Sequence, residues 1–231
     1  MIVKGSEMMN IKKTVGEAAV ELIEDGMTVG LGTGSTAYWA IAKIGERVKK
    51  GLNISAIATS KESEVFAREL NIPMVTFSEI NEIDITIDGA DEVDPDLNLI
   101  KGGGGALLRE KIIATASEKL IVIVDDTKLV KQLGAFPLPV EVIPFGIEST
   151  RAKIEKLGCK TELRLSDKTK EFITDNGNYI LDCEFPMIKN PEKTSQELNG
   201  IPGVVDNGLF IGLAHRVFVG RQNGSVNIIQ K

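Results

Sequence analysis

Three short segments of the chain contain most of the residue types that could act on a small polar substrate. They are GTGST at residues 32–36, DGADE at residues 88–92 and KGGGGALLREK at residues 101–111. The first offers hydroxyls and a flexible backbone, the second three carboxylates, and the third a lysine, four glycines and a glutamate. Together they supply groups that can bind an anion, accept a proton and stabilise a developing negative charge.

The segment Gly32–Ala37 fits the GxGxxG/A pattern of dinucleotide-binding loops, because it follows an apolar run and opens a helical pattern. Such sites also need an acidic residue at the tip of the second strand to hold a ribose hydroxyl. The chain has ATSK there, at residues 58–61, without a carboxylate. A monophosphate therefore fits better, held by backbone N–H groups and by Thr33, Ser35 and Thr36. A tight turn with one capping hydroxyl would explain part of the same pattern.

Asp88, Asp91 and Glu92 crowd three carboxylates just past the apolar run 83–87. Like charges this close cost energy unless a ligand or a neighbouring donor uses them. A metal ion is one such use, but the only histidine, His215, lies far away in the sequence. A turn with a capping aspartate is the simpler alternative. We predict no metal ligands and no cofactor.

The segment Lys101–Lys111 is the most informative, because four consecutive glycines give up backbone entropy that a linker in a compact domain seldom needs to give up. Close approach of the backbone to a ligand explains them. The loop leads into a helix, so its N–H groups can stabilise negative charge, with Lys101 at its entry and Glu110 one to two turns inside. The alternatives are an exposed turn lysine and a solvent-facing glutamate within the charge run 109–111.

The elements that must position these segments alternate between helical and strand patterns over the first two thirds of the chain. This alternation predicts βαβ units and a Rossmann-like open α/β fold, with a mainly parallel sheet and helices on both faces. The carboxyl ends of the strands, where the three segments should meet, form the ligand crevice in such sheets. Helices are expected at 11–24, 37–48, 61–70 and 106–116, and strands at 27–31, 53–58, 83–87 and 120–124.

Beyond about residue 133 the pattern changes, with Pro137, Pro139 and Pro144 interrupting it. A helix at 149–157 and strands at 160–165 and 178–183 predict a smaller α+β domain, of the ferredoxin-like kind. The apolar run 208–219 is expected to return to the main sheet. We therefore expect a Rossmann-like catalytic domain of residues 1–132 and 206–231, and a small domain of residues 133–205.

Composition limits the partners of the chain. No apolar run approaches the roughly 20 residues of a membrane span, and residues 1–10 lack the apolar core of a signal peptide. The formal net charge of −6 argues against a nucleic-acid partner, which normally requires a basic face. Cys159 and Cys183 have no CxxC spacing and are expected to be unpaired thiols. We expect a cytoplasmic protein that binds neither membranes nor nucleic acid.

Taken together, in this order and at this spacing, GTGST, DGADE and KGGGGALLREK resemble the ribose-5-phosphate isomerase type A family. The likeness runs from Ile11-Lys12-Lys13 through Lys128, and the proline-rich second half is compatible with it. The family interconverts D-ribose 5-phosphate and D-ribulose 5-phosphate in the non-oxidative branch of the pentose phosphate pathway. Its reaction proceeds through an enediolate without a metal or an organic cofactor, and its members commonly form dimers or tetramers.

The resemblance implies a role for each matching residue. Glu110 would be the base that removes and returns the proton, and Lys101 would lie near the developing oxyanion. Asp88 and Asp91 would bind sugar hydroxyls and assist ring opening. The other substrate contacts implied are Lys12, Thr33, Gly34, Ser35, Thr36, Gly89, Ala90, Gly102, Gly103, Gly104 and Lys128.

Other functions make different demands on the sequence. A sugar-phosphate sensor without catalysis would be expected to carry a helix-turn-helix, and we expect none before Ile11. A CoA transferase needs a glutamate nucleophile on a loop and a larger acyl-carrier site. An amino sugar phosphate deaminase needs histidine-assisted ring opening, for which only His215 is present. A nicotinamide dehydrogenase lacks its ribose-binding acid.

Overall fold

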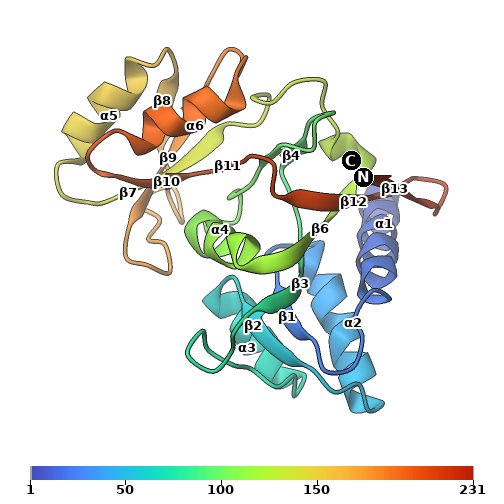
Figure 1. Ribbon diagram of the computed structural model, residues 1–231. Helices are drawn as coiled ribbons and strands as arrows, with labels where there is room; N and C mark the ends of the chain where they lie inside the picture. Colours follow the sequence, from blue (N-terminus) through green and yellow to red (C-terminus); the bar gives the residue numbers. More distant parts are fainter. Residues whose placement is uncertain (1, 231) are drawn as a thin grey trace. The chain divides into compact units, whose positions relative to one another are not determined.

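The computed structural model describes residues 2–230 (Figure 1). None of the helices in this range has the length and apolarity needed to cross a membrane. The helices are α1 (Ile2–Val20), α2 (Ala37–Lys49), α3 (Lys61–Glu69), α4 (Leu107–Thr115), α5 (Ile147–Glu155) and α6 (Pro191–Asn199), with a 3₁₀ turn at Asp126–Lys128. The strands are β1 (Thr28–Leu31), β2 (Ser55–Ala58), β3 (Ile83–Asp88), β4 (Glu92–Val93), β5 (Leu99–Ile100), β6 (Ser117–Asp125), β7 (Leu138–Val142), β8 (Lys160–Leu163), β9 (Tyr179–Glu184), β10 (Val204–Asn207), β11 (Leu209–Phe210), β12 (Ala214–Gly220) and β13 (Val226–Gln230).

The chain folds into two compact units and crosses between them after Ala90, Leu108, Leu129 and Gly212. The first unit contains the residues up to Ala90, Arg109–Leu129 and the residues from Leu213 on; the second contains Asp91–Leu108 and Val130–Gly212. These bounds differ from those expected from the sequence, which placed 91–108 and 206–212 in the large domain. The reason is that β4, β5 and β11 pair with one another in a three-stranded sheet of their own.

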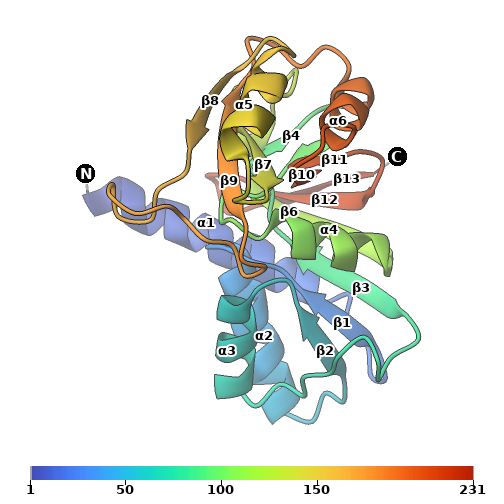
Figure 2. The same ribbon diagram turned by 90° about the vertical axis from the view of Figure 1, so that its left-hand side faces the viewer.

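The first unit is built on a six-stranded sheet with the order β13-β12-β6-β3-β1-β2. All neighbours pair in parallel except β12 and β13, so the predicted Rossmann-like sheet is confirmed, with one antiparallel edge strand. Figure 2 shows α2 and α3 on one side of β1, β2 and β3, and α4 on the other. Burial of apolar side chains holds these layers together: Val15, Ile41 and Ala67 of α1, α2 and α3 pack on one face, and Ile113 of α4 packs on the other.

Helix α1 and the run 208–219 differ from the expected elements, and α1 begins at Ile2, before the expected start at Ile11. Helix α1 ends at Val20 instead of Glu24, because the N–H groups of Leu22 and Ile23 donate to carbonyls only three residues back and tighten the chain into a turn. Of the run 208–219, only the part in β12 joins the main sheet. The part in β11 belongs to the second unit.

The second unit contains a four-stranded antiparallel sheet with the order β10-β7-β9-β8. Its elements follow one another as β7, α5, β8, β9, α6 and β10, which is the βαββαβ order of ferredoxin-like folds. The predicted small α+β domain is therefore confirmed in kind. Its apolar core contains Val140, Ile154, Leu181 and Leu198, from the central strands and both helices.

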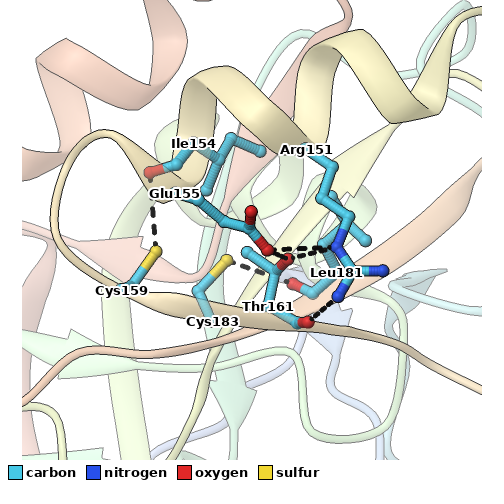
Figure 3. A network of polar contacts seen from close by, with 7 residues as sticks. All are labelled: Arg151, Ile154, Glu155, Cys159, Thr161, Leu181 and Cys183. Atoms are coloured by element: carbon cyan, nitrogen blue, oxygen red, sulfur yellow. Dashed lines mark hydrogen bonds and ion pairs between the residues drawn. The ribbon is translucent and has the colours of Figure 1, made fainter.

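Both cysteines lie in the core of the second unit, one just before β8 and the other in β9 (Figure 3). The Cys159 thiol donates to the carbonyl of Ile154, and the Cys183 thiol to that of Leu181, each at 3.6 Å. When Cys159 is deprotonated, the Cys183 thiol can donate to it instead of to Leu181, which lowers the pKa of Cys159. The same bond, together with burial, raises the pKa of Cys183 well above its usual value.

Candidate active site

In the first unit, two of the segments meet at the carboxyl ends of β1 and β3. These strands pair in parallel, with Leu31 opposite Ile87, so the GTGST loop and Asp88 follow neighbouring strand ends. The Asp88 side chain is only 1% exposed, and its Oδ1 accepts from the N–H of Thr33 at 3.0 Å and of Gly89 at 2.7 Å. A Cβ at Gly32 would lie 2.3 Å from that oxygen. The glycine is therefore required for the carboxylate to reach the loop backbone.

Lys12 is brought to the same loop from helix α1. Its Nζ donates to Ser35 Oγ at 2.8 Å, although the two residues are far apart in the sequence. Gly34 and Ser35 are exposed, and Gly34 has a φ of +101°, which favours glycine. Thr36 precedes α2 but makes no side-chain capping bond to that helix. The exposed rim of the loop thus carries an ammonium, hydroxyls and the start of a helix, which together suit an anion.

The Thr33 hydroxyl faces a cluster of hydroxyls that sequence analysis did not single out. Thr33 Oγ1 lies 2.7 Å from Thr59 Oγ1 and 2.8 Å from Ser60 Oγ, and Ser63 Oγ lies at 3.3 Å. Ser60 also caps α3 by accepting from the N–H of Ser63. This cluster ties the GTGST loop to the start of α3. Two of these hydroxyls, those of Thr59 and Ser60, belong to the ATSK segment. In the sequence that segment drew attention only because it lacks a carboxylate.

Glu110 lies in the first turn of α4 and is only 5% exposed. The alternative of a solvent-facing residue in a charge run therefore does not hold for this side chain. The N-terminal turn of a helix carries a partial positive charge that favours a carboxylate, which helps to offset the cost of removing it from water. The position thus combines a negative side chain with a shielded environment.

Lys101, in the second unit, is also buried, at 2% exposure. Its ammonium lies 5.5 Å from the centre of the Phe210 ring, a cation–π contact with β11. Its backbone N–H donates to the carbonyl of Gly208 at 2.9 Å. The alternative of an exposed turn lysine does not hold. Phe210 was not predicted, since the run 208–219 carried only a strand signal.

The four glycines after Lys101 form a tight loop that is bonded to Asp91. The N–H of Gly103 donates to Asp91 Oδ2 at 2.8 Å, and that of Gly105 to the Gly102 carbonyl at 2.9 Å. Gly102 and Gly105 have φ values of +101° and +82°, whereas Gly103 and Gly104 form the exposed turn. A Cβ at Gly103 would lie 2.5 Å from Asp91 Oδ1. Asp91 and the loop therefore form one bonded group.

Glu92, the third carboxylate of DGADE, has a structural role within the second unit. It is buried, and its two oxygens accept from the N–H groups of Gly134 and Phe136 at 2.8 and 2.6 Å. The crowded carboxylates of the sequence are thus divided among different backbone donors. Within residues 2–230, no group of three or more His, Cys, Asp or Glu side chains is placed to hold a metal ion.

Lys128 ends the 3₁₀ turn that follows β6, the strand next to the one that carries Asp88. Its side chain is partly exposed, and Asp125 shapes the turn by accepting from the N–H and the hydroxyl of Thr127. In the first unit the expected contacts therefore follow neighbouring strands: the GTGST loop after β1, Asp88, Gly89 and Ala90 at β3, and Lys128 after β6.

Comparisons with known proteins decide the family. The sequence profile of ribose 5-phosphate isomerase A (phosphoriboisomerase A) matches residues 55–224. The chain belongs to the ribose-5-phosphate isomerase A family. It is 56% identical to ribose-5-phosphate isomerase A of Bacillus mycoides over 218 residues, which cover 94% of this chain and 98% of the relative.

Solved structures of the ribose-5-phosphate isomerase family agree with this assignment. The enzyme from Plasmodium falciparum has a TM-score of 0.94 and 39% identity, covering 97% of this chain and 99% of its own. A D-ribose-5-phosphate isomerase solved in complex with phospho-erythronic acid has a TM-score of 0.92 and 42% identity, covering 96% and 98%. The resemblance seen in the three sequence segments is confirmed.

Proposed function

We propose that this chain is an isomerase that interconverts D-ribose 5-phosphate and D-ribulose 5-phosphate, the activity for which its relatives are named. The observation that carries the proposal is Glu110, a buried carboxylate in the first turn of α4 in a chain of this family. A carboxylate largely removed from water is a stronger base than an exposed one and can take a proton from one carbon and deliver one to the next.

In the proposed reaction Glu110 removes the proton from C2 of the open-chain aldose. The electrons of that C–H bond form the C1=C2 double bond, and the carbonyl electrons move to O1, which gives an enediolate. The Glu110 carboxyl then returns a proton to C1 while O2 gives up its proton to O1 and becomes the ketose carbonyl. General acid–base catalysis of this kind contributes about 10²- to 10⁴-fold.

Lys101 is proposed to stabilise the negative oxygen of the enediolate. A buried ammonium is worth more to such an oxygen than an exposed one, because water does not screen it. The glycine loop that follows adds backbone N–H groups, and Asp91, bonded to that loop at Gly103, would accept from a sugar hydroxyl. Asp88 would do the same and assist opening of the sugar ring.

The substrate phosphate is proposed to bind the exposed polar groups of the first unit. Lys12, Ser35 and Thr36, with the loop backbone at Gly34, offer one positive charge, hydroxyls and N–H groups. Lys128 would add a second ammonium. No relative among those compared supports the alternative of a sensor without catalysis. We further propose a cytoplasmic homodimer or homotetramer, which light scattering on the purified protein would test.

One experiment tests the isomerase and its route together. The protein is incubated with ribose 5-phosphate in deuterated buffer containing a chelator, and NMR follows ketose formation and deuterium at C1 of the ketose. We expect ketose to form despite the chelator, with solvent deuterium at C1. Neither ketose nor exchange from a folded protein that binds phosphate would contradict the proposal and favour the sensor.

The same assay can test whether this chain is inhibited by phospho-erythronic acid, the compound bound in one of the solved relatives. That compound has a carboxylate where the substrate has its reacting carbons, so its two oxygens imitate those of the enediolate. We propose that it binds this chain and inhibits it competitively against ribose 5-phosphate. Calorimetry measures its affinity independently of turnover.

A further inference from the structure

The carbonyls of the glycine loop are bonded to an arginine that comes from the ferredoxin-like part of the second unit. Arg164, one residue beyond β8, donates from Nη1 to the carbonyl of Gly102 at 2.9 Å and to that of Gly103 at 3.1 Å. These bonds span about sixty residues of chain within one compact unit. The loop is therefore attached to a sheet that contributes no residue to the expected site.

The other edge of the Arg164 guanidinium is bonded to the carboxylate of Asp182. Nε donates to Asp182 Oδ2 at 2.9 Å and Nη2 donates to Asp182 Oδ1, so the pair is bidentate. The Arg164 side chain is 14% exposed, and its Cζ lies 6.0 Å from the centre of the Phe172 ring. Asp182 belongs to β9, in the middle of the antiparallel sheet. The arginine thus links a rigid strand to the loop through a planar group with little freedom.

The bonds to Arg164 also set the directions of the loop's N–H groups. In a trans peptide the C=O and the N–H point to opposite sides. With its C=O on Arg164, the peptide between Gly102 and Gly103 directs its N–H to Asp91, as observed at 2.8 Å. The next peptide also has its C=O on Arg164, so the N–H of Gly104 points away from the guanidinium.

The ring of Phe172 limits the loop at its far end. A Cβ added to Gly105 would lie 2.3 Å from the Phe172 Cζ atom, so the ring leaves room for glycine alone. The backbone N–H of Phe172 donates to the Arg164 carbonyl at 2.9 Å, which fixes the two residues to each other. Arg164, Phe172 and Asp182 together hold the exposed Gly103–Gly104 turn in one conformation. Without them four glycines would sample many conformations.

We propose that Arg164 is a positioning residue of the isomerase reaction: by holding two carbonyls of the glycine loop, it presents the N–H of Gly104 to the negative oxygen of the enediolate. This inference rests on the proposed function. A donor aimed before the reaction stabilises the transition state more than one that must first be ordered. Lysine at this position could not hold two carbonyls and a carboxylate at once, since it lacks the planar fork.

The second unit offers a matched control in Arg151 (Figure 3). Arg151 donates from Nε to Glu155 at 3.1 Å and to the Thr161 hydroxyl at 2.7 Å, and from Nη2 to the Thr161 carbonyl. It therefore makes a comparable set of bonds between a helix and β8. None of these bonds reaches the glycine loop. Its side chain is 45% exposed, so its removal tests what the loss of a hydrogen-bonded arginine does to the unit as a whole.

The experiment compares R164A, R164K, D182N and R151A with the wild type. We expect kcat to fall about 10- to 100-fold in R164A and R164K, with a smaller change in KM, because small misplacements of catalytic groups cost this much. D182N should show a smaller loss, and R151A should keep wild-type kcat. The thermal midpoint from circular dichroism should fall more in R164A, whose arginine is 14% exposed, than in R151A, whose arginine is 45% exposed.

Rescue with guanidinium provides a readout that a purely structural role would not move. Arg164 borders a surface cavity of about 280 Å³ that is also lined by Gly103, Pro137 and Asp182, so a small cation can enter the space left in R164A. We expect millimolar guanidinium to restore part of the kcat of R164A, and ethylammonium to restore less. The affinity for phospho-erythronate should fall in R164A and not in R151A.

Two results would overturn the proposal. One is a folded R164A with wild-type kcat and wild-type affinity for phospho-erythronate. The other is a loss of kcat that R151A shares and that guanidinium leaves unchanged. The wild type is measured in the same assay, so that failure of the proposed isomerase activity and failure of the proposed Arg164 role can be told apart. Absence of wild-type turnover would count against the isomerase activity. The affinities of R164A and R151A for phospho-erythronate would still test whether Arg164 positions the loop.

Discussion

Each unit holds its own proposed site residues by a different structural means. In the first unit, Asp88 and the GTGST loop follow neighbouring parallel strands and are bonded through backbone N–H groups close to the strand ends. In the second, Lys101 and the glycine loop depend on side chains of distant strands, above all Phe210 and Arg164. Parallel strand ends thus position residues locally, whereas a glycine loop needs partners from elsewhere in the chain.

This difference has a consequence for variants. In the first unit we expect changes to act on the residue changed and on the stability of the sheet beneath it. In the second we expect changes far from the loop in sequence to alter the reaction itself.

The largest effect is expected from E110Q in the first unit. The amide keeps the shape of the side chain but cannot accept the proton, so kcat should fall about 10²- to 10⁴-fold with little change in KM. Steady-state kinetics and deuterium exchange at C1 measure this. E118Q, on an exposed glutamate of β6, is the control and should behave as the wild type. If E110Q keeps more than a tenth of the wild-type kcat, another group is the base.

K101M in the second unit should lower kcat about 10²- to 10³-fold, the usual cost of losing one group that stabilises an oxyanion. K101R should lose less, because a positive charge over Phe210 is retained. Exposed Lys119 supplies the control as K119M. A K101M variant whose KM rises while kcat stays unchanged would place Lys101 in ground-state binding instead.

Two glycine variants compare the units directly. In G32A the new Cβ would meet the fixed Asp88 carboxylate at 2.3 Å, so we expect about 1–3 kcal/mol of lost stability as well as lost activity. In G103A the Cβ would meet Asp91 at 2.5 Å within an exposed turn that can shift. Its melting temperature should stay near the wild-type value while kcat falls. Equal destabilisation of both variants would contradict the comparison.

The smallest effect on activity is expected at the cysteines. Because the pKa of Cys159 is lowered and that of Cys183 is raised, iodoacetamide should modify Cys159 first as pH rises, and Cys183 only after unfolding. In C183A, which removes the donor, the labelling of Cys159 should shift to higher pH. Mass spectrometry of peptides measures both sites. Labelling of Cys183 before Cys159 in the folded protein would refute the assignment.

The parallel sheet and the small α+β domain could be predicted, because strand–loop–helix patterns are local in sequence. The burial of Glu110 and Lys101 could not be predicted without the family resemblance, since both stand among charged or polar neighbours in the sequence. Burial depends on which elements pack over a residue. Which elements pack over a residue depends on contacts between segments that are far apart in the sequence.

The residues that hold the glycine loop of the second unit could not be predicted from the sequence, for the same reason. Arg164 stands in the segment LRLS, which has no pattern of its own, and its role follows only from bonds to Gly102, Gly103 and Asp182. The bounds of the units were also hidden, because the short strands β4, β5 and β11 carry too few residues to show a period. Sequence periodicity identifies long helices and strands but cannot identify strands of two residues.

The placement of β12 makes completion of the first unit's sheet depend on a strand far from β6 in the sequence. This strand lies between β6 and β13 in the first unit's sheet and pairs Val217 with Val122 in a fully buried row. Until β12 has been synthesised, β6 can pair with β3 on one side only, and its other side is an unpaired, apolar edge. Contacts this distant in sequence slow folding and prolong the exposure of such an edge. The order of the strands in the chain thus leaves an apolar edge of β6 exposed until β12 can pair with it.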